Sequence, residues 1–229
     1  YLADSSEALS AFGDGTMYFE RFINNLRHIE VQVIGDSHGN AIHIGERDCS
    51  LQRRHQKVIE ESPAILLNDE TRAKLHEVAV KATKYLKYEG AGTFEFLADD
   101  KQNIYFMEMN TRLQVEHPVS EMVSGLDIIE WMIKVAEGEK LPPQESIRFR
   151  GHAIECRITA EDPNNFLPCP GKITQWMVPG GRNVRVDSHI YTNYIVPPYY
   201  DSMIGKLIVW GRDREKAINI MKRALSEFE

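Results

Sequence analysis

The sequence lacks the features of disulfide-stabilised, zinc-stabilised and membrane-spanning proteins. It has three cysteines, Cys49, Cys156 and Cys169, which lie far apart and form no C-x-x-C pair. Neither a disulfide framework nor a structural zinc site is therefore indicated. No apolar stretch approaches the roughly 18 residues of a membrane span, and no basic-then-apolar segment marks a signal peptide. We expect a cytoplasmic chain with reduced thiols.

Low-complexity tracts and a strong excess of positive charge are also absent. The 229 residues include 15 Gly and 10 Pro, too few for a linker, and 42% of them are hydrophobic, which suits a compact fold. The formal net charge of −7 argues against a general surface for nucleic acid or anionic membranes, so any anion must be bound locally. The chain begins at Tyr1 rather than Met and ends within a helical pattern, which predicts a piece of a longer protein.

Hydrophobic periodicity predicts strands and helices in the first half. Residues 17–22, 28–34 and 41–44 alternate between polar and apolar, and a Gly/Asp/Asn turn joins the last two into a hairpin. The period changes to that of a helix at 68–88, and one face of this helix collects its apolar residues, Leu75, Val78, Ala79, Ala82 and Leu86. Further predicted elements are strands at 92–98 and 104–109 and a helix at about 124–137.

Residues 141–146, which include two prolines, read as a domain boundary. Beyond them the pattern is mainly that of strands separated by Pro and Gly. The predicted elements are strands near 152–159, 171–177, 184–187 and 204–210 and a helix from about 213.

Two glutamates are predicted to face each other across the strands at 92–98 and 104–109. A hairpin centred between Lys101 and Gln102 pairs Glu95 with Glu108. Like charges directly opposite each other destabilise a sheet, so a cation is expected between them. Asn110 adds an amide oxygen on the same face, and this donor set suits Mg²⁺ or Mn²⁺. The alternative is a solvated polar face whose glutamates diverge.

The polar alternation continues past the second strand. Its members on one side are Glu108, Asn110, Arg112, Gln114 and Glu116. A solvent-exposed strand would show the same period. The residue types favour an anion-binding catalytic site, because the guanidinium fork of Arg112 suits a planar anion and the Glu116 carboxylate could serve as a base.

Residues 46–57 gather basic, His and Gln side chains in an otherwise acidic chain. This favours a phosphate or carboxylate subsite, and the alternative is a solvated charge run or an interface paired with Glu60 and Glu61. His28 lies on a polar strand face, where a lone His is more often structural. No glycine-rich phosphate-binding motif is present.

Together these segments resemble biotin carboxylase, the ATP-grasp component of biotin-dependent carboxylases. The matching segments run nearly from end to end: 46–50 (ERDCS), 52–57 (QRRHQK), 92–96 (GTFEF), 108–118 (EMNTRLQVEHP), 151–158 (GHAIECRI), 160–163 (AEDP), 166–168 (FLP), 170–173 (PGKI) and 197–206 (PPYYDSMIGK). The resemblance implies an α+β fold. Residues 1–140 would form the C-terminal portion of an ATP-grasp domain, an antiparallel sheet with helices, and residues 147–229 a mainly β, truncated biotin carboxylase C-terminal domain.

The resemblance also implies roles for individual residues. The residues matching ATP contacts are Glu20, Arg21, Phe22, Ile23, His28, Gln52, His55 and Glu95. Those matching ligands of Mg²⁺ or Mn²⁺ are Glu95, Glu108 and Asn110. Those matching contacts to bicarbonate or biotin are Lys57, Arg112, Gln114, Val115 and Arg157. Catalytic roles would fall to Lys57, Arg112, Glu116 as the base for bicarbonate, and Arg157 as the group that stabilises the biotin enolate.

The implied reaction is ATP-dependent formation of carboxyphosphate from bicarbonate, followed by transfer of CO₂ to carrier-bound biotin. The implied partners are a biotin carboxyl carrier protein or domain, a carboxyltransferase and a second copy of the chain, with no nucleic acid and no membrane. No residue decides between acetyl-CoA, pyruvate and propionyl-CoA carboxylase. The family's N-terminal domain and glycine-rich lid do not precede Tyr1, so we expect the chain alone to be inactive. A carbamoyl-phosphate-forming ATP-grasp ligase and a non-catalytic assembly or regulatory fragment are the alternatives.

Overall fold

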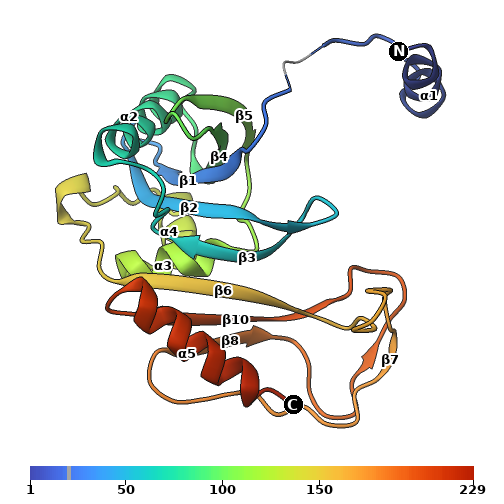
Figure 1. The fold of residues 1–229 in the computed structure, drawn as a ribbon. Helices are drawn as coiled ribbons and strands as arrows, with labels where there is room; N and C mark the ends of the chain where they lie inside the picture. The colour runs from blue at the N-terminus through green and yellow to red at the C-terminus, as the bar shows by residue number, and fades with distance from the viewer. Residues whose placement is uncertain (20–21) are drawn as a thin grey trace.

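A single antiparallel sheet of eight strands forms the centre of the protein in a computed structural model that describes residues 1–19 and 22–229 (Figure 1). The strand order is β5-β4-β1-β2-β3-β6-β10-β8. These strands are β1 (Arg27–Gly35), β2 (Ala41–Arg53), β3 (Gln56–Ser62), β4 (Gly90–Ala98), β5 (Ile104–Asn110), β6 (His152–Thr159), β8 (Val184–Ser188) and β10 (Met203–Gly211). Two short strands, β7 (Gly171–Lys172) and β9 (Ile195–Val196), form a separate pair.

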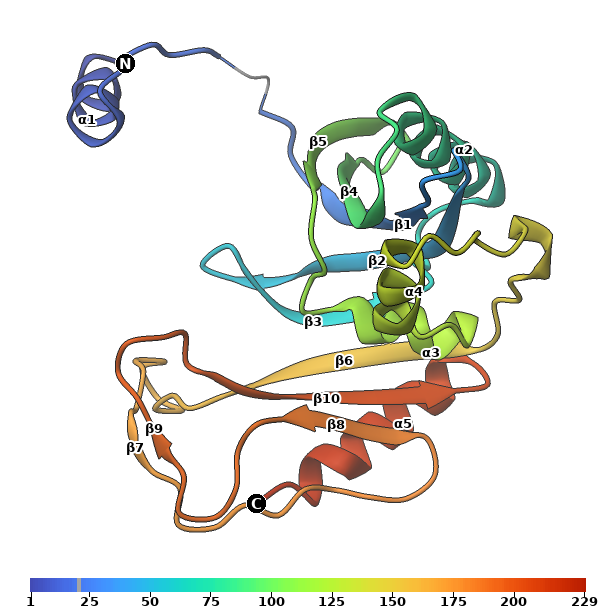
Figure 2. The same cartoon turned by 180° about the vertical axis from the view of Figure 1, so that it is seen from behind.

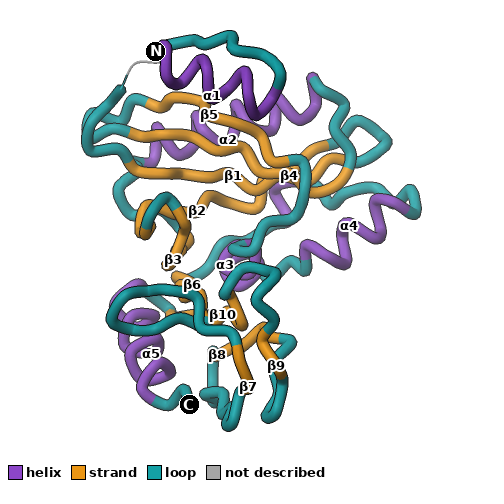
Figure 3. The backbone as a smooth tube through the Cα atoms, turned by 90° about the vertical axis from the view of Figure 1, so that its right-hand side faces the viewer, coloured by secondary structure: helices purple, strands orange, loops and turns teal. Residues whose placement is uncertain are grey.

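Helices pack on both faces of the sheet. These are α2 (Asp69–Tyr85), α3 (His117–Ser124), α4 (Ile128–Ala136) and α5 (Arg214–Ser226), whereas α1 (Leu2–Phe12) does not pack on the sheet. Residues Gln144–Ser146 form a 3₁₀ turn. Helix α5 lies in front of the strands in Figure 1, whereas α3 and α4 lie in front in Figure 2. Figure 3 shows β5-β4-β1-β2 as one group of strands and β6-β10-β8 as another, and β3 connects them. The fold confirms the predicted α+β class.

The two faces of the sheet differ because side chains alternate along each strand. On one face Ile29 and Phe94 pack with Leu75 of α2, and Leu207 packs with Ala217 of α5. On the other face α3 and α4 cover apolar residues at the far end of the strands. Polar side chains occupy the rest of that second face, and the candidate site is built on them.

The first half confirms the predicted hairpin and most of the predicted helix. Strands β1 and β2 pair as expected, and α2 begins after Asn68, whose side chain accepts a hydrogen bond from the Thr71 N–H at 2.7 Å. The predicted apolar face of α2 is only partly right. Leu75, Ala79 and Ala82 pack into the core, whereas Val78 and Leu86 are exposed.

Two other predictions for the first half need correction. Residues 17–19 and 22 are not in a strand, and Glu20 and Arg21 lie outside the described residues. Strand β5 ends at Asn110, and the predicted helix at 124–137 is confirmed as α4 over Ile128–Ala136, but it begins later than expected because a separate helix, α3, ends just before it. The reason is local: Pro118 starts α3, and Gly125 ends it with φ 75° in the left-handed region.

The second half follows the predicted order of elements with two corrections. The strand expected at 171–177 is confined to β7, which pairs with the unpredicted β9. Helix α5 ends at Ser226, and the Glu229 N–H bonds the Met177 carbonyl instead of continuing the helix. Helix α1, also unpredicted, stands apart from the sheet and buries no side chain. The division into domains at 1–140 and 147–229 stays a prediction.

None of the helices in the described ranges is both long enough and apolar enough to cross a membrane.

Candidate active site

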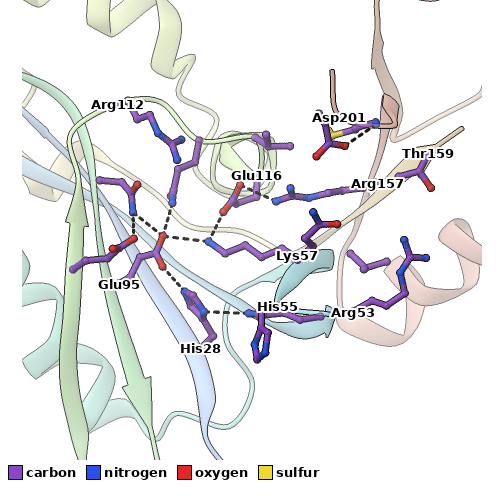
Figure 4. Close-up of a pocket in the computed structure, with 18 of the residues that line it drawn as sticks. His28, Arg53, His55, Lys57, Glu95, Arg112, Glu116, Arg157, Thr159 and Asp201 are labelled. Atoms are coloured by element: carbon purple, nitrogen blue, oxygen red, sulfur yellow. Dashed lines mark hydrogen bonds and ion pairs between the residues drawn. The ribbon is translucent and has the colours of Figure 1, made fainter. Parts of the chain in front are cut away.

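A polar cavity of about 370 Å³ opens on the second face of the sheet (Figure 4). Its walls come from β1, the β2–β3 hairpin, β4, β5, the segment that leads into α3, and β6. The residues that line it include His28, Gln52, Arg53, His55, Lys57, Glu95, Glu108, Asn110, Arg112, Gln114, Val115, Glu116, Arg157, Glu161 and Asp201. Apart from Phe22, Ile23 and the two undescribed residues, every predicted site residue lies here.

Three carboxylates stand side by side across neighbouring strands at the base of this cavity. Glu108 pairs with Glu95, and Glu95 pairs with Glu30. The predicted hairpin register is therefore confirmed at Glu95, although it shifts by one residue nearer the turn, where Phe96 pairs with Phe106. Adjacent like charges repel one another, so this row requires cations.

Lys57 and His28 supply positive or hydrogen-bonding groups to the row. The Lys57 Nζ contacts Glu30 and lies 3.3 Å from Glu95 Oε1 and 2.8 Å from Glu116 Oε1. The His28 Nε2 lies 2.7 Å from Glu95 Oε2 (Figure 4). Burial acts to raise the pKa of Glu95, but His28 and Lys57 outweigh it and lower that pKa to about 2. Glu95 is thus ionised at neutral pH.

The predicted metal ligands converge on one point. The Asn110 amide lies 2.9 Å from both Glu95 Oε1 and Glu108 Oε1. Rotation of this amide turns its oxygen toward the same point, because the nitrogen and oxygen of a carboxamide occupy equivalent positions. Two carboxylates and an amide oxygen fit a hard divalent cation such as Mg²⁺ or Mn²⁺.

Glu116 sits immediately before α3, where it is 2% exposed. Its two carboxylate oxygens face different cations: Oε1 accepts from Lys57 at 2.8 Å and Oε2 from the Arg157 guanidinium at 3.2 Å. Burial opposes ionisation, but Arg47, Lys57 and Arg157 together hold the pKa of Glu116 below its ordinary value. A buried, ionised carboxylate at the edge of an open cavity can accept a proton from a bound substrate.

Arg157 is held by two acidic groups. Its Nε donates to Glu60 Oε1 at 2.7 Å, and a terminal nitrogen donates to Glu116. Strand β6 positions this guanidinium at the opposite wall from the carboxylate row (Figure 4).

Several other predicted residues have more peripheral places. Arg112 is exposed at the rim, with one guanidinium nitrogen 3.3 Å from the Leu113 carbonyl. His55 is exposed at the β2–β3 turn, and the Gln52 amide lies 3.2 Å from His28 Nδ1. Val115 offers its carbonyl to Lys206 at 2.7 Å. These positions leave polar atoms of Arg112 and His55 free to meet a ligand that enters the cavity.

Phe22 and Ile23 are not among the cavity residues. Phe22 is 87% exposed. The structure therefore does not bring these two predicted ATP contacts to the other site residues.

Sequence reasoning missed Arg47 and Glu30, which support the site from below. Arg47 is fully buried and donates hydrogen bonds to five side chains, those of Glu30, Gln32, Thr93, Gln114 and Ser120. The predicted basic patch at 46–57 is thus divided between this network and the cavity. The alternation of His28, Glu30 and Gln32 in an otherwise apolar strand was the available signal.

Gln114 connects the network to the carboxylate row. Its Nε2 donates to Glu95 Oε1 at 2.6 Å, and its Oε1 accepts from Arg47 at 2.8 Å. His28, Glu30 and Glu95 also place one ligand atom each within 4.8 Å of the others, so His28 and Glu30 widen the set of groups that could meet a cation.

Comparison with known proteins identifies two successive family models. Residues 2–144 match the ATP binding domain of the carbamoyl-phosphate synthase L chain, and residues 155–229 match the biotin carboxylase C-terminal domain. The chain is 57% identical to the biotin carboxylase of Nostoc sp. over 99% of its length and 51% of that protein. It thus spans about half the length of the curated relatives that it matches.

Two solved structures resemble the chain in both sequence and fold. A biotin carboxylase–β,γ-ATP complex from Campylobacter jejuni is 69% identical and superposes with a TM-score of 0.96, covering 100% of this chain and 51% of that one. The biotin carboxylase domain dimer of the Hydrogenobacter thermophilus 2-oxoglutarate carboxylase, in complex with MgADP, ADP and bicarbonate, is 52% identical. Its TM-score is 0.93, over 98% of this chain and 50% of that one.

These comparisons agree with one another. Both family models, the identity over nearly all residues of the chain and the matching fold lead to one conclusion: the chain belongs to the biotin carboxylase family.

Proposed function

We propose that the full-length protein carboxylates carrier-bound biotin, with bicarbonate as the carbon source and ATP as the phosphoryl donor. The observation that carries this proposal is the position of Glu116, a buried carboxylate held between Lys57 and Arg157 at the edge of the cavity. A base between two cations suits a reaction that deprotonates one anion and stabilises another.

In the first step the γ-phosphoryl group of ATP is transferred to a bicarbonate oxygen, which forms carboxyphosphate and ADP. A divalent cation bound by Glu95, Glu108 and Asn110 would neutralise charge on the transferring phosphoryl group. The Arg112 fork at the rim would hold the planar bicarbonate, and Glu116 would take its proton at a carboxylate oxygen. Lys57 would offset the negative charge that gathers between them.

In the second step carboxyphosphate breaks down to CO₂ and phosphate, and CO₂ forms a bond to N1′ of biotin. The phosphate released by this breakdown would take the N1′ proton, which places negative charge on the ureido oxygen. Arg157 can stabilise this charge, because it lines the cavity and its bond to Glu60 fixes the guanidinium there.

The proposal carries further expectations. The partners would be a biotin carboxyl carrier protein or domain, a carboxyltransferase and a second copy of the chain. A cytoplasmic location agrees with the free thiols of Cys49, Cys156 and Cys169. Similar biotin carboxylases belong to different enzymes, among them pyruvate carboxylase and 2-oxoglutarate carboxylase, so the acyl acceptor is left open.

The test is ADP formation by the full-length protein with and without added biotin. Biotin should stimulate ADP formation, and Arg157→Ala and Glu116→Ala should each lower the stimulated rate by about tenfold or more. Arg148→Ala and Glu145→Ala, which change the same residue types outside the cavity, serve as controls. Absence of biotin stimulation, or variants within about threefold of the wild type, would contradict the proposal. A carbamoyl-phosphate-forming ligase would show no biotin stimulation.

A further inference from the structure

Two buried carboxyl groups lie behind Arg157 and have no part in the mechanism above. Glu60 of β3 and Glu155 of β6 are partners across these strands, and both are 0% exposed. Paired residues on antiparallel strands project to the same face, with Cβ atoms about 4.5–5.5 Å apart. Arg157, two residues after Glu155, projects to that face as well. The carboxyl pair therefore forms part of the support beneath the cavity wall.

The hydrogen bonds of the two carboxyl groups are unequal. Glu60 Oε1 accepts from the Arg157 Nε at 2.7 Å, whereas Glu60 Oε2 has no donor among the described residues. Neither oxygen of Glu155 has a hydrogen-bond partner in the part of the chain that the structure describes. An ionised carboxylate without a donor is strongly disfavoured in a protein interior, so Glu155 is the member of the pair that carries a proton.

The charged surroundings agree with this assignment. Three strands supply cations near the pair: Lys57 on β3, Arg157 on β6 and Lys206 on β10. One further anion, Glu116, lies near it in the segment before α3. Burial raises the pKa of Glu155 well above its ordinary value, and the charges of Glu60 and Glu116 raise it further. The neighbouring thiols of Cys49 and Cys156 also have raised pKa values, since both are buried next to acidic groups.

We propose that Glu60 is a positioning residue for Arg157 and that Glu155 stays protonated, so that the pair holds one negative charge rather than two. This inference rests on the proposed function, because it assigns Arg157 to the biotin step. With Nε bound to Glu60 and one terminal nitrogen bound to Glu116, the guanidinium cannot rotate out of the wall. A second buried negative charge would over-neutralise Arg157 and weaken its hold on a developing enolate.

The first experiment separates the two steps in the full-length protein. ADP formation is measured with ATP and bicarbonate alone, and again with added biotin. Glu60→Ala should lower the increment due to biotin by about tenfold or more, while the biotin-free rate and the KM for ATP stay within about twofold. Glu60→Gln keeps an acceptor for Arg157 without the charge, so its increment should fall between those of the wild type and Glu60→Ala.

Glu61→Gln is the matched control. Glu61 follows Glu60 on β3 but faces the opposite side of the sheet, where it contacts His152 and Arg214. The Glu61→Gln variant should leave the ratio of the biotin-stimulated rate to the biotin-free rate of ADP formation unchanged, even if the variant is less stable. The inference is wrong if Glu60→Ala lowers both rates equally, or if the biotin increment stays within about threefold of the wild type. If Glu60→Ala does not fold, an unchanged increment in Glu60→Gln overturns it.

The second experiment is independent of activity. An infrared difference spectrum between the wild type and Glu155→Gln at neutral pH should contain the C=O stretch of a protonated carboxyl group. Absence of that band overturns the assignment of the proton to Glu155, whatever the enzyme assays show. Conversely, if the wild type shows the band but biotin does not stimulate ADP formation, the proposed function is contradicted, whereas the assignment of a proton to Glu155 is supported.

Discussion

At the scale of single residues, burial and neighbouring charges give the same residue type different ionisation states. Glu95 and Glu155 are both buried glutamates on the same face of the sheet. His28 and Lys57 keep the pKa of Glu95 low, whereas Glu155 has no donor among the described residues and its pKa is raised by burial. Burial raises the pKa of both carboxyl groups, and the difference arises because only Glu95 has cationic and hydrogen-bonding partners that outweigh it.

The metal assignment can be tested at Glu108, which has few contacts besides Asn110. Glu108→Gln should raise the Mg²⁺ concentration needed for half-maximal ADP formation by the full-length protein about tenfold, because a charged ligand becomes neutral. The matched control is Glu77→Gln, an exposed glutamate on α2 whose partner is Lys81. A Mg²⁺ dependence that stays the same in Glu108→Gln would remove Glu108 from the ligand set.

At the scale of elements, the site depends on where strands end. Strand β5 stops at Asn110, and Pro118 starts α3 a short distance later, so that Glu116 turns inward at the head of the helix. A continued strand would have carried Glu116 along the edge of the sheet and away from Lys57. The pairing of β3 with β6 then brings Arg157 to Glu116.

A close approach at the end of β1 gives a test of packing between elements. A Cβ atom added to Gly35 would lie 1.9 Å from the Tyr88 carbonyl oxygen, just after α2. Gly35→Ala should therefore lower the free energy of unfolding by about 1–3 kcal/mol, measured by urea denaturation. Gly180→Ala is the control, because no atom lies within 4 Å of its added Cβ and its φ is not positive. Equal stabilities of the two variants would show that Tyr88 moves aside at no cost.

At the scale of the whole molecule, buried ion pairs tie stability to pH. Glu46 beside His76 and Arg72, and Glu61 beside His152 and Arg214, have pKa values that burial would raise but that these partners lower to about 2, as for Glu95. A carboxyl group whose pKa is lowered by folding stabilises the folded state at pH values above its ordinary pKa of about 4.5. This contribution is lost as the pH falls toward 2. The Tm should therefore decrease progressively on acidification below about pH 5.

Glu155 should show the opposite dependence. Because folding raises the pKa of Glu155, its contribution to stability is fully present at pH values below its ordinary pKa. The contribution is lost as the pH rises through the higher pKa of the folded state. Glu155→Gln, which cannot ionise, should consequently gain stability relative to the wild type as pH increases. Thermal unfolding of both proteins across neutral and alkaline pH measures this difference. A constant difference in Tm between them would show that Glu155 does not titrate in that range.

The sequence by itself determined the features that depend on neighbours along the chain. The alternation around Glu95 and Glu108 predicted a hairpin in the correct register at that pair, since a short turn leaves little freedom. The starts of α2 near residue 68 and of α5 near residue 213 were readable for the same reason. Long motifs also carried the family assignment, because each preserves several chemical groups at once.

Only the tertiary structure decided which distant groups meet. Periodicity assigns Glu60 and Glu155 each to a face of a strand, but it does not say that β3 lies next to β6. It likewise gave no sign that Arg47 would be fully buried while His55 stays exposed. Ionisation and hydrogen bonding depend on distances between side chains far apart in sequence, and those distances exist only once the sheet has formed.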